Sequence, residues 1–159
     1  MIHIEINISR QRLQVYDDQT QLRDYRVSTA KNGVGELCGS EKTPRGKHLV
    51  RAKVGQGCPA NTVFVKRRPT GEIYTPALRK LYPQRDWILT RILWLSGLEV
   101  GKNRLGSVDT MRRYIYIHGS PDEVQMGRPG SRGCIRMRNQ EIIDLYQIIP
   151  VGTLIQISE

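Results

Sequence analysis

Two reactive side chains, Cys134 and His118, stand out in this 159-residue sequence. The chain contains only three cysteines and three histidines, so few nucleophile–base pairs are available to it. Cys134 lies in a glycine-rich run, Gly130-Ser131-Arg132-Gly133-Cys134-Ile135-Arg136-Met137. Glycine before a cysteine lets the backbone turn tightly and point its N–H groups at one spot. An oxyanion hole requires that arrangement, so the run predicts a thiol beside oxyanion-binding amides.

His118 is the candidate general base for this thiol. It ends an apolar segment, 114–118, and Gly119 and Ser120 follow it directly, so a rigid strand would position the imidazole within reach of solvent. A loop containing Gly127, Pro129 and Gly130 separates it from the cysteine and could bring the two together. From the residues alone, a buried cysteine near an unrelated histidine fits equally well.

Arg132 and Arg136 flank the cysteine on either side. Positive charge close to a thiol stabilises the thiolate, so the two arginines predict an activated nucleophile. The other cysteines and histidines have plainer interpretations. We expect His3 and His48 at the surface or at a strand edge, and Cys38 and Cys58 outside the chemistry.

Metal binding is the rival use of cysteine and histidine. The sequence has no Cys-x-x-Cys pair and no closely spaced histidine pair, so we expect no zinc site, no other metal and no cofactor.

Length and charge narrow the class of protein. The length predicts one domain spanning 1–159. The net charge is +10, but the basic residues are scattered, and only 66–68 form a tight cluster. No zinc-finger spacing, basic helix or aromatic platform accompanies the charge, so we expect no nucleic-acid partner. A small anionic substrate fits the same charge.

Hydropathy patterning predicts a mostly β protein. Apolar residues alternate with polar ones, or cluster between turn residues, in a series of predicted strands: 2–8, 13–16, 22–29, 48–54, 62–66, 88–95, 114–118 and 153–157. One helix is expected over 142–149, with Asn139 as its N-cap and Pro150 ending it. We interpret 30–45, 68–84 and 97–110 as loops, the second as a lid or a plain surface loop with one helical turn at most.

The first residues follow a strand pattern rather than that of a secretory signal. The most apolar window, 87–95, is too short to cross a bilayer, and the odd number of cysteines argues against a disulfide framework. The sequence therefore predicts a cytoplasmic protein with no membrane partner, or a periplasmic one if Met1 is not the natural start. We expect a monomer by default.

The spacing of these elements resembles the L,D-transpeptidase catalytic domain (YkuD family). The likeness rests on Ile117-His118-Gly119, a spacer, and Ser131-Arg132-Gly133-Cys134-Ile135-Arg136-Met137. The opening hairpin 2–16, the segments 27–33 and 42–46, and the strand 151–157 are similar to further parts of that domain, so the resemblance covers nearly the whole chain. It implies a β-sandwich or barrel with a late helix and a loop-borne site. Arg132 departs from the family pattern, which often has histidine there.

The resemblance implies cysteine acyl transfer on peptidoglycan stem peptides or muropeptides. Cys134 would be the nucleophile and His118 the base, oriented by the carbonyl of Gly119 or Ser120. Amides of Gly133 and Cys134 would hold the oxyanion, and the substrate's carboxylates would meet Arg132 and Arg136. Ser131 and Ser120 would complete the oxyanion- and substrate-binding residues. For Arg136, a structural role in the catalytic loop has comparable weight.

The cytoplasmic expectation favours an L,D-carboxypeptidase that releases D-Ala during muropeptide recycling. The alternative is an L,D-transpeptidase that crosslinks the diamino acids of two stems. A non-catalytic glycan- or nucleic-acid-binding domain is a third interpretation, against which the intact cysteine and histidine argue. Carbapenems would be expected to acylate the cysteine.

Overall fold

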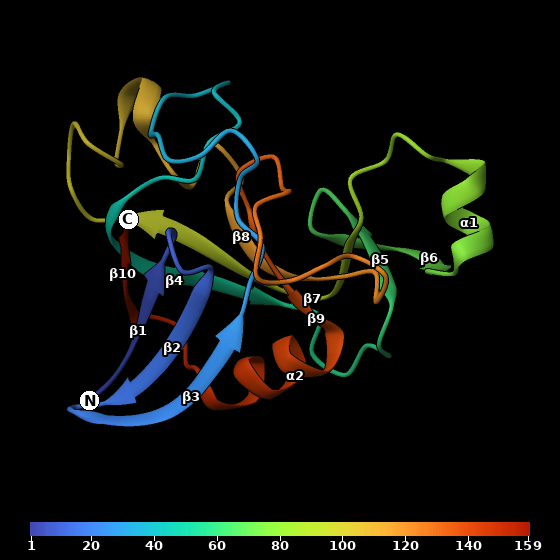
Figure 1. The fold of residues 1–159 in the computed structure, drawn as a ribbon, viewed down its shortest axis with the longest axis horizontal. Coiled ribbons are helices and arrows are strands. Elements are labelled where there is room, and N and C mark those ends of the chain that lie inside the picture. The colour runs from blue at the N-terminus through green and yellow to red at the C-terminus, as the bar shows by residue number, and fades with distance from the viewer.

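A single curled sheet of ten strands dominates the computed structural model, which describes residues 1–159 (Figure 1). The expectation of a mostly β fold with one late helix is confirmed. In chain order the elements are β1 (Ile2–Asn7), β2 (Arg12–Asp17), β3 (Thr20–Arg26), β4 (Gly46–Val54), β5 (Thr62–Val65), β6 (Arg68–Ile73), α1 (Pro76–Leu81), β7 (Ile88–Gly97), a 3-10 turn (Gly106–Val108), β8 (Tyr116–Ser120), β9 (Ile135–Arg138), α2 (Asn139–Ile148) and β10 (Leu154–Ser158).

The sheet order is β3-β2-β1-β10-β4-β7-β5-β6, and β8 branches from β7 to pair with β9. Most neighbours are antiparallel, but β1 pairs with β10 and β8 pairs with β9 in parallel. Helix α2 lies against β7, β8 and β9 (Figure 1). The inward face of the curl and the apolar face of α2 enclose the main core, which buries Ile6, Leu93, Ile117 and Leu145 completely.

The late helix appears where periodicity predicts it, with Ile142, Leu145 and Tyr146 buried against the sheet. Asn139 is not its N-cap, contrary to expectation. It is the first helical residue and is buried. Its Oδ1 accepts a hydrogen bond from Thr90 Oγ1, and its Nδ2 donates to Asn61 Oδ1 at 2.9 Å. The Asn139 side chain therefore bonds to residues distant in the sequence and does not cap the helix.

The segment 68–84 is not the loop we expected. Its first part is β6, which forms a hairpin with β5, and its second part contains α1, whose N-cap Thr75 accepts from Leu78 N at 3.1 Å. Lys66 and Arg67 form the hairpin tip with φ of 50° and 64°. Two successive residues in the left-handed region make the tight two-residue turn that matches the twist of a hairpin.

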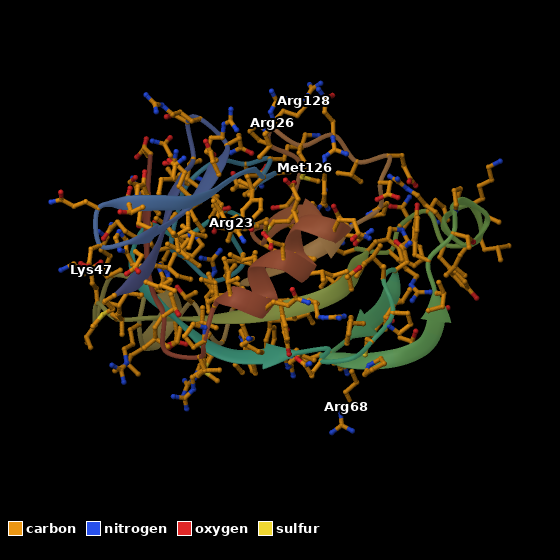
Figure 2. All side chains as sticks on the ribbon, turned by 90° about the horizontal axis from the view of Figure 1, so that it is seen from below. Arg23, Arg26, Lys47, Arg68, Met126 and Arg128 are labelled. Carbon is orange, nitrogen blue, oxygen red and sulfur yellow. The ribbon has the colours of Figure 1, made fainter.

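Basic side chains are spread over the surface, as the sequence suggests. Figure 2 shows Arg26 and Arg128 on one side of the molecule and Arg68 on the opposite side. Neither helix combines the length and hydropathy needed to cross a membrane.

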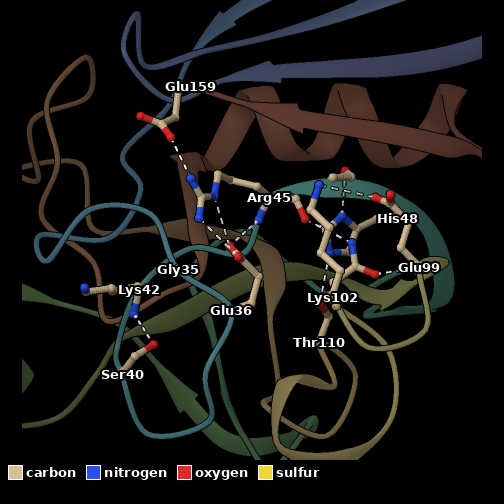
Figure 3. Close-up of polar contacts among 12 residues, drawn as sticks. Gly35, Glu36, Ser40, Lys42, Arg45, His48, Glu99, Lys102, Thr110 and Glu159 are labelled. Carbon is tan, nitrogen blue, oxygen red and sulfur yellow. Dashed lines mark hydrogen bonds and ion pairs between the residues drawn. The ribbon is translucent and has the colours of Figure 1, made fainter.

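His48 is buried, whereas we expected it at the surface or at an edge. Its Nδ1 lies 3.0 Å from Gly46 O and its Nε2 lies 2.9 Å from Thr110 Oγ1 (Figure 3). Burial lowers the pKa of His48 to about 4. His48 is thus a neutral core residue that ties β4 to the segment before β8. His3 is half-buried and stacks on Tyr16.

Candidate active site

The parallel pairing of β8 with β9 brings the two predicted reactive residues onto neighbouring segments of the sheet. His118 lies opposite Arg136, and Cys134 immediately precedes β9. The backbone N–H of Tyr116, two residues before His118, donates to Cys134 Sγ at 3.3 Å. The glycine-rich loop therefore returns the cysteine to the strand that carries the histidine.

His118 is completely buried, whereas we expected it within reach of solvent, and its two ring nitrogens have different surroundings. Nδ1 lies 2.6 Å from Gly119 O, and because a carbonyl only accepts hydrogen bonds, Nδ1 carries a proton. Nε2 has no hydrogen-bond partner. Burial lowers the pKa of His118, so the ring is neutral at pH 7 and Nε2 holds a free lone pair. An unprotonated, oriented nitrogen is what a general base needs.

The Cys134 thiol does not hydrogen-bond to His118 in this structure. It donates to Tyr114 O at 3.3 Å while accepting from the Tyr116 amide. Burial raises the pKa of the thiol to about 12, even though the Tyr116 N–H, Arg136 and Arg113 act in the opposite direction. Our expectation that flanking arginines hold a thiolate is therefore wrong for the resting site. Loss of hydration outweighs the nearby positive charge of Arg136 and Arg113.

Ser131 organises the turn before the thiol. Its hydroxyl donates to Cys134 O at 2.6 Å and accepts from Gly133 N at 3.1 Å. The Gly133 amide is thus occupied, in contrast to its expected role in the oxyanion hole. The Cys134 amide makes no hydrogen bond within the protein and is the free donor of this turn.

Gly133 has a conformational reason to be glycine. Its φ is +132°, and an added Cβ would lie 3.2 Å from Ile115 Cδ1 and 3.3 Å from Lys42 O. Its carbonyl accepts from Thr43 Oγ1 at 2.9 Å. Thr43 belongs to the 42–46 segment that the resemblance had already marked, and here it ties the cysteine loop to the segment before β4.

Gly119 supplies the carbonyl that orients His118, and it has no space for a side chain. A Cβ there would lie 2.7 Å from Leu89 O and would also collide with Asn139 Oδ1. Ser120 does not have the expected substrate-binding role. It is completely buried, and its hydroxyl donates to Met137 O at 3.2 Å, so a substrate cannot reach it.

The two expected substrate-binding arginines lie in different settings. Arg136 is mostly buried, forms an ion pair with Asp86 at 3.2 Å and donates to Gly130 O at 3.1 Å. Arg132 is exposed and donates only to Gln84 O, at 3.2 Å. Sequence reasoning missed Asp86, because fifty positions separate it from Arg136 and no local spacing signals the contact.

A pocket of about 590 Å³ opens onto Cys134. Its charged lining residues are four cations and one acid: Lys66, Arg67, Arg113, Arg132 and Asp86. Four positive charges minus one negative charge leave +3. Lys66 and Arg67 belong to the basic cluster 66–68, which no sequence pattern connects with the cysteine. They line the pocket because they form the tip of the β5–β6 hairpin.

Arg67 and Arg113 are held in place by their neighbours. The Arg67 guanidinium lies over the rings of Trp94 and Tyr114, at 4.7 and 4.9 Å, and donates to Tyr116 Oη at 2.9 Å. Arg113 is half-buried, has no ion-pair partner and donates to backbone carbonyls that include Lys42 O at 2.6 Å. The pocket thus has positive walls of fixed geometry, and Cys38 and Cys58 do not line it.

The family model of the L,D-transpeptidase catalytic domain (YkuD) matches residues 2–157. The chain belongs to this family. Among its relatives, the putative L,D-transpeptidase YqjB of Bacillus subtilis (strain 168) is 49% identical over 43 residues, which cover 27% of this chain and 24% of YqjB. The probable L,D-transpeptidase ErfK/SrfK of Salmonella typhimurium is 31% identical over 111 residues, which cover 67% of this chain and 35% of the relative.

Solved structures show the same fold. An L,D-transpeptidase from Mycobacterium smegmatis superposes with a TM-score of 0.59 at 19% identity, over 99% of this chain and 58% of that one. L,D-transpeptidase 3 from Mycobacterium tuberculosis, in complex with a faropenem-derived adduct, gives 0.60 at 14% identity, over 99% and 60%. This chain therefore spans about three fifths of these solved chains and matches smaller parts of the curated relatives.

Proposed function

We propose that this protein cleaves the bond between the diamino acid and D-Ala of peptidoglycan stem tetrapeptides by cysteine acyl transfer. The observation that carries the proposal is the unpartnered Nε2 of His118 on β8, next to the segment that holds the Cys134 thiol against the Tyr116 amide of the same strand. A base with a free lone pair beside a neutral thiol is the resting form of a nucleophile that becomes activated when substrate arrives.

The first step forms the acyl-enzyme. The Cys134 thiol leaves Tyr114 O and turns toward His118, whose Nε2 takes the proton as sulfur attacks the diamino acid carbonyl. A carbon–sulfur bond forms and the carbonyl oxygen becomes an oxyanion. The free Cys134 amide is the donor placed to stabilise that charge. The carbon–nitrogen bond then breaks, and His118 returns its proton to the departing D-Ala nitrogen.

The second step resolves the thioester. Water attacks the acyl carbon, His118 Nε2 takes one of its protons, and the carbon–sulfur bond breaks to leave a tripeptide. The proton returns from His118 to the Cys134 sulfur, so the enzyme is restored with one water consumed. The Nδ1–H bond to Gly119 O keeps the ring in the tautomer that this cycle needs.

The charge of the pocket supports the choice of substrate. Stem peptides carry several carboxylates, and the lining that contains Lys66, Arg67, Arg113 and Arg132 carries a net +3. Charge of this sign raises the local concentration of anionic ligands. Because Trp94 and Tyr114 hold Arg67 in place, little side-chain freedom is lost when a carboxylate binds it.

The acceptor that resolves the thioester determines the biological role. Water gives an L,D-carboxypeptidase that trims muropeptides in recycling, which we favour together with a cytoplasmic site of action. An amine from a second stem gives a crosslink, and the names of the relatives favour that outcome. The same activated thiol would be acylated by a carbapenem.

The test is mass spectrometry of the protein incubated with disaccharide-tetrapeptide. We expect tripeptide and free D-Ala, abolished in Cys134→Ala and retained in the matched control Cys38→Ala, since Cys38 is exposed and outside the pocket. Crosslinked dimers in place of tripeptide would show that the protein is a transpeptidase and would overturn the hydrolytic role. An unchanged tetrapeptide, or turnover that survives Cys134→Ala, would overturn the proposal. A carbapenem adduct in the intact mass, absent from Cys134→Ala, would support an accessible thiol.

A further inference from the structure

A second pocket, which we call the arginine pocket, borders the thiol pocket. It has a volume of about 260 Å³, several times the roughly 30 Å³ that one water occupies in the liquid. Its lining includes four arginines and a tryptophan: Arg79, Arg85, Arg132, Arg136 and Trp87. Arg132 lines both pockets. The Arg136–Asp86 ion pair stands between them, with Asp86 on the thiol side.

Three of the four guanidinium groups already have a carboxylate. These pairs are Arg79 with Glu123 at 3.4 Å, Arg85 with Glu72 at 2.8 Å, and Arg136 with Asp86 at 3.2 Å. Arg132 has none, and its single hydrogen bond goes to the carbonyl of Gln84. Four cations minus three acids leave one uncompensated positive charge. The arginine pocket is therefore charge-matched to one carboxylate.

Trp87 gives an independent indication of a ligand. The residue is 5% exposed, yet its Nε1–H has no acceptor in the protein. Its ring is fixed, because the Arg85 guanidinium lies 4.5 Å from the ring centroid and Tyr74 meets it edge-on at 5.1 Å. Buried indole N–H groups normally find a partner. An acceptor oxygen bound in the arginine pocket would provide one.

We propose that the arginine pocket binds the α-carboxylate of the substrate's C-terminal D-Ala, with Arg132 as the principal contact. The inference rests on the proposed cleavage at Cys134 and adds the part of the substrate that is recognised. The terminal carboxylate lies only two bonds beyond the scissile nitrogen, so its receptor must adjoin the thiol pocket. Arg132, shared by the two pockets, meets that condition. A stem extended beyond D-Ala has a neutral amide at this place and loses the contact.

The experiment compares two ligands that differ at one group, a tetrapeptide with a free C-terminus and the same tetrapeptide as its C-terminal amide. Binding is measured by calorimetry with Cys134→Ala protein, which cannot turn the ligands over. We expect the acid to bind at least tenfold more tightly than the amide, because hydrogen bonds to charged groups are the stronger ones. Adding Arg132→Gln should remove that preference by weakening the acid alone.

A matched control and a second variant keep the result interpretable. Arg10→Gln removes the same charge from an exposed arginine whose side chain has no hydrogen bond or ion pair, and the preference should persist. Trp87→Phe keeps a ring and deletes the N–H, and should lower the preference by less than Arg132→Gln does.

The possible failures are distinguishable. Equal binding of acid and amide, binding of neither, or a preference that survives Arg132→Gln would overturn the arginine pocket as the carboxylate site. Turnover is assayed separately with wild-type protein, which retains Cys134, so these binding results do not decide whether the protein cleaves the stem peptide. Loss of turnover on the free acid in the wild-type protein would instead refute the proposed function.

Discussion

The resting thiol should react slowly, and the magnitude follows from its surroundings. Burial raises the pKa of Cys134 from the ordinary 9.0 to about 12, so at neutral pH its thiolate is about a thousandfold scarcer than that of an ordinary thiol. A more basic thiolate is also the better nucleophile. With a Brønsted slope of about 0.4–0.5, the higher pKa makes each Cys134 thiolate roughly 16- to 30-fold more reactive than an ordinary one. The net expectation is reaction about 30- to 60-fold slower than for an ordinary accessible thiol.

The assay uses a small neutral disulfide, so that the positive pocket neither attracts nor repels the reagent. Peptide mass spectrometry then follows modification of Cys134 and Cys38 in the same sample. Cys38 is exposed and supplies the rate of an accessible thiol. The Cys134 rate should rise tenfold per pH unit from pH 7 to 10 without a plateau, because the thiol is the dominant form throughout.

The variant that separates the alternatives is His118→Ala. Because the thiol bonds Tyr114 O rather than the imidazole, this variant should change the Cys134 rate little in the absence of substrate. A plateau below pH 8, Cys134 reacting faster than Cys38, or a large loss of rate in His118→Ala would each refute the reasoning. Such results would mean that a thiolate–imidazolium pair exists before substrate binds.

Three further predictions concern stability. Gly133→Ala should lower the free energy of unfolding by about 1–3 kcal/mol, since φ is +132° and the new Cβ would crowd Lys42 O; a melting temperature equal to that of the wild type would contradict this. Ser131→Ala should cost a similar 1–3 kcal/mol, because it leaves the Gly133 N–H and Cys134 O without their partner, and urea titration would measure it. The folded-state pKa of His48 is about 4, below its ordinary 6.5, so its contribution is complete above pH 6.5 and declines as the pH falls toward 4. The loss is about 3 kcal/mol, and a stability–pH profile no flatter in His48→Gln would argue against it. The pKa of His118 is lowered too and acts in the same direction.

Much of the sheet could be predicted from the sequence, because alternating apolar residues report which strand face is buried. Ile4 and Ile6 are completely buried in β1, and the helix over 139–148 follows the spacing of Ile142, Leu145 and Tyr146. Strand β9, by contrast, was not predicted. It has four residues, two of them arginines, and it exists because it pairs in parallel with β8 rather than through local preference.

The site was predictable where its chemistry is local and obscure where it depends on distant contacts. Cys134 and His118 stand in short motifs. The resemblance implied that the carbonyl of Gly119 or Ser120 orients the imidazole, and in the structure the contact is to Gly119. The burial of His48 could not be foreseen from its position at a strand start. The partner of Arg136, Asp86, also had no local signal. Both depend on which segments meet in the folded chain, and no spacing within one segment encodes that.

The place of β10 in the sheet has a consequence for synthesis of the protein. β10 lies between β1 and β4, so it alone joins the β3-β2-β1 hairpins to the rest of the sheet. β10 is synthesised after the nine other strands. During synthesis the edge of β1 therefore stays unpaired until β10 leaves the ribosome. Pairing over so long a sequence separation closes slowly. A nascent chain that stops before Leu154 would expose the edges of β1 and β4, and we expect such chains to be recognised by chaperones and proteases.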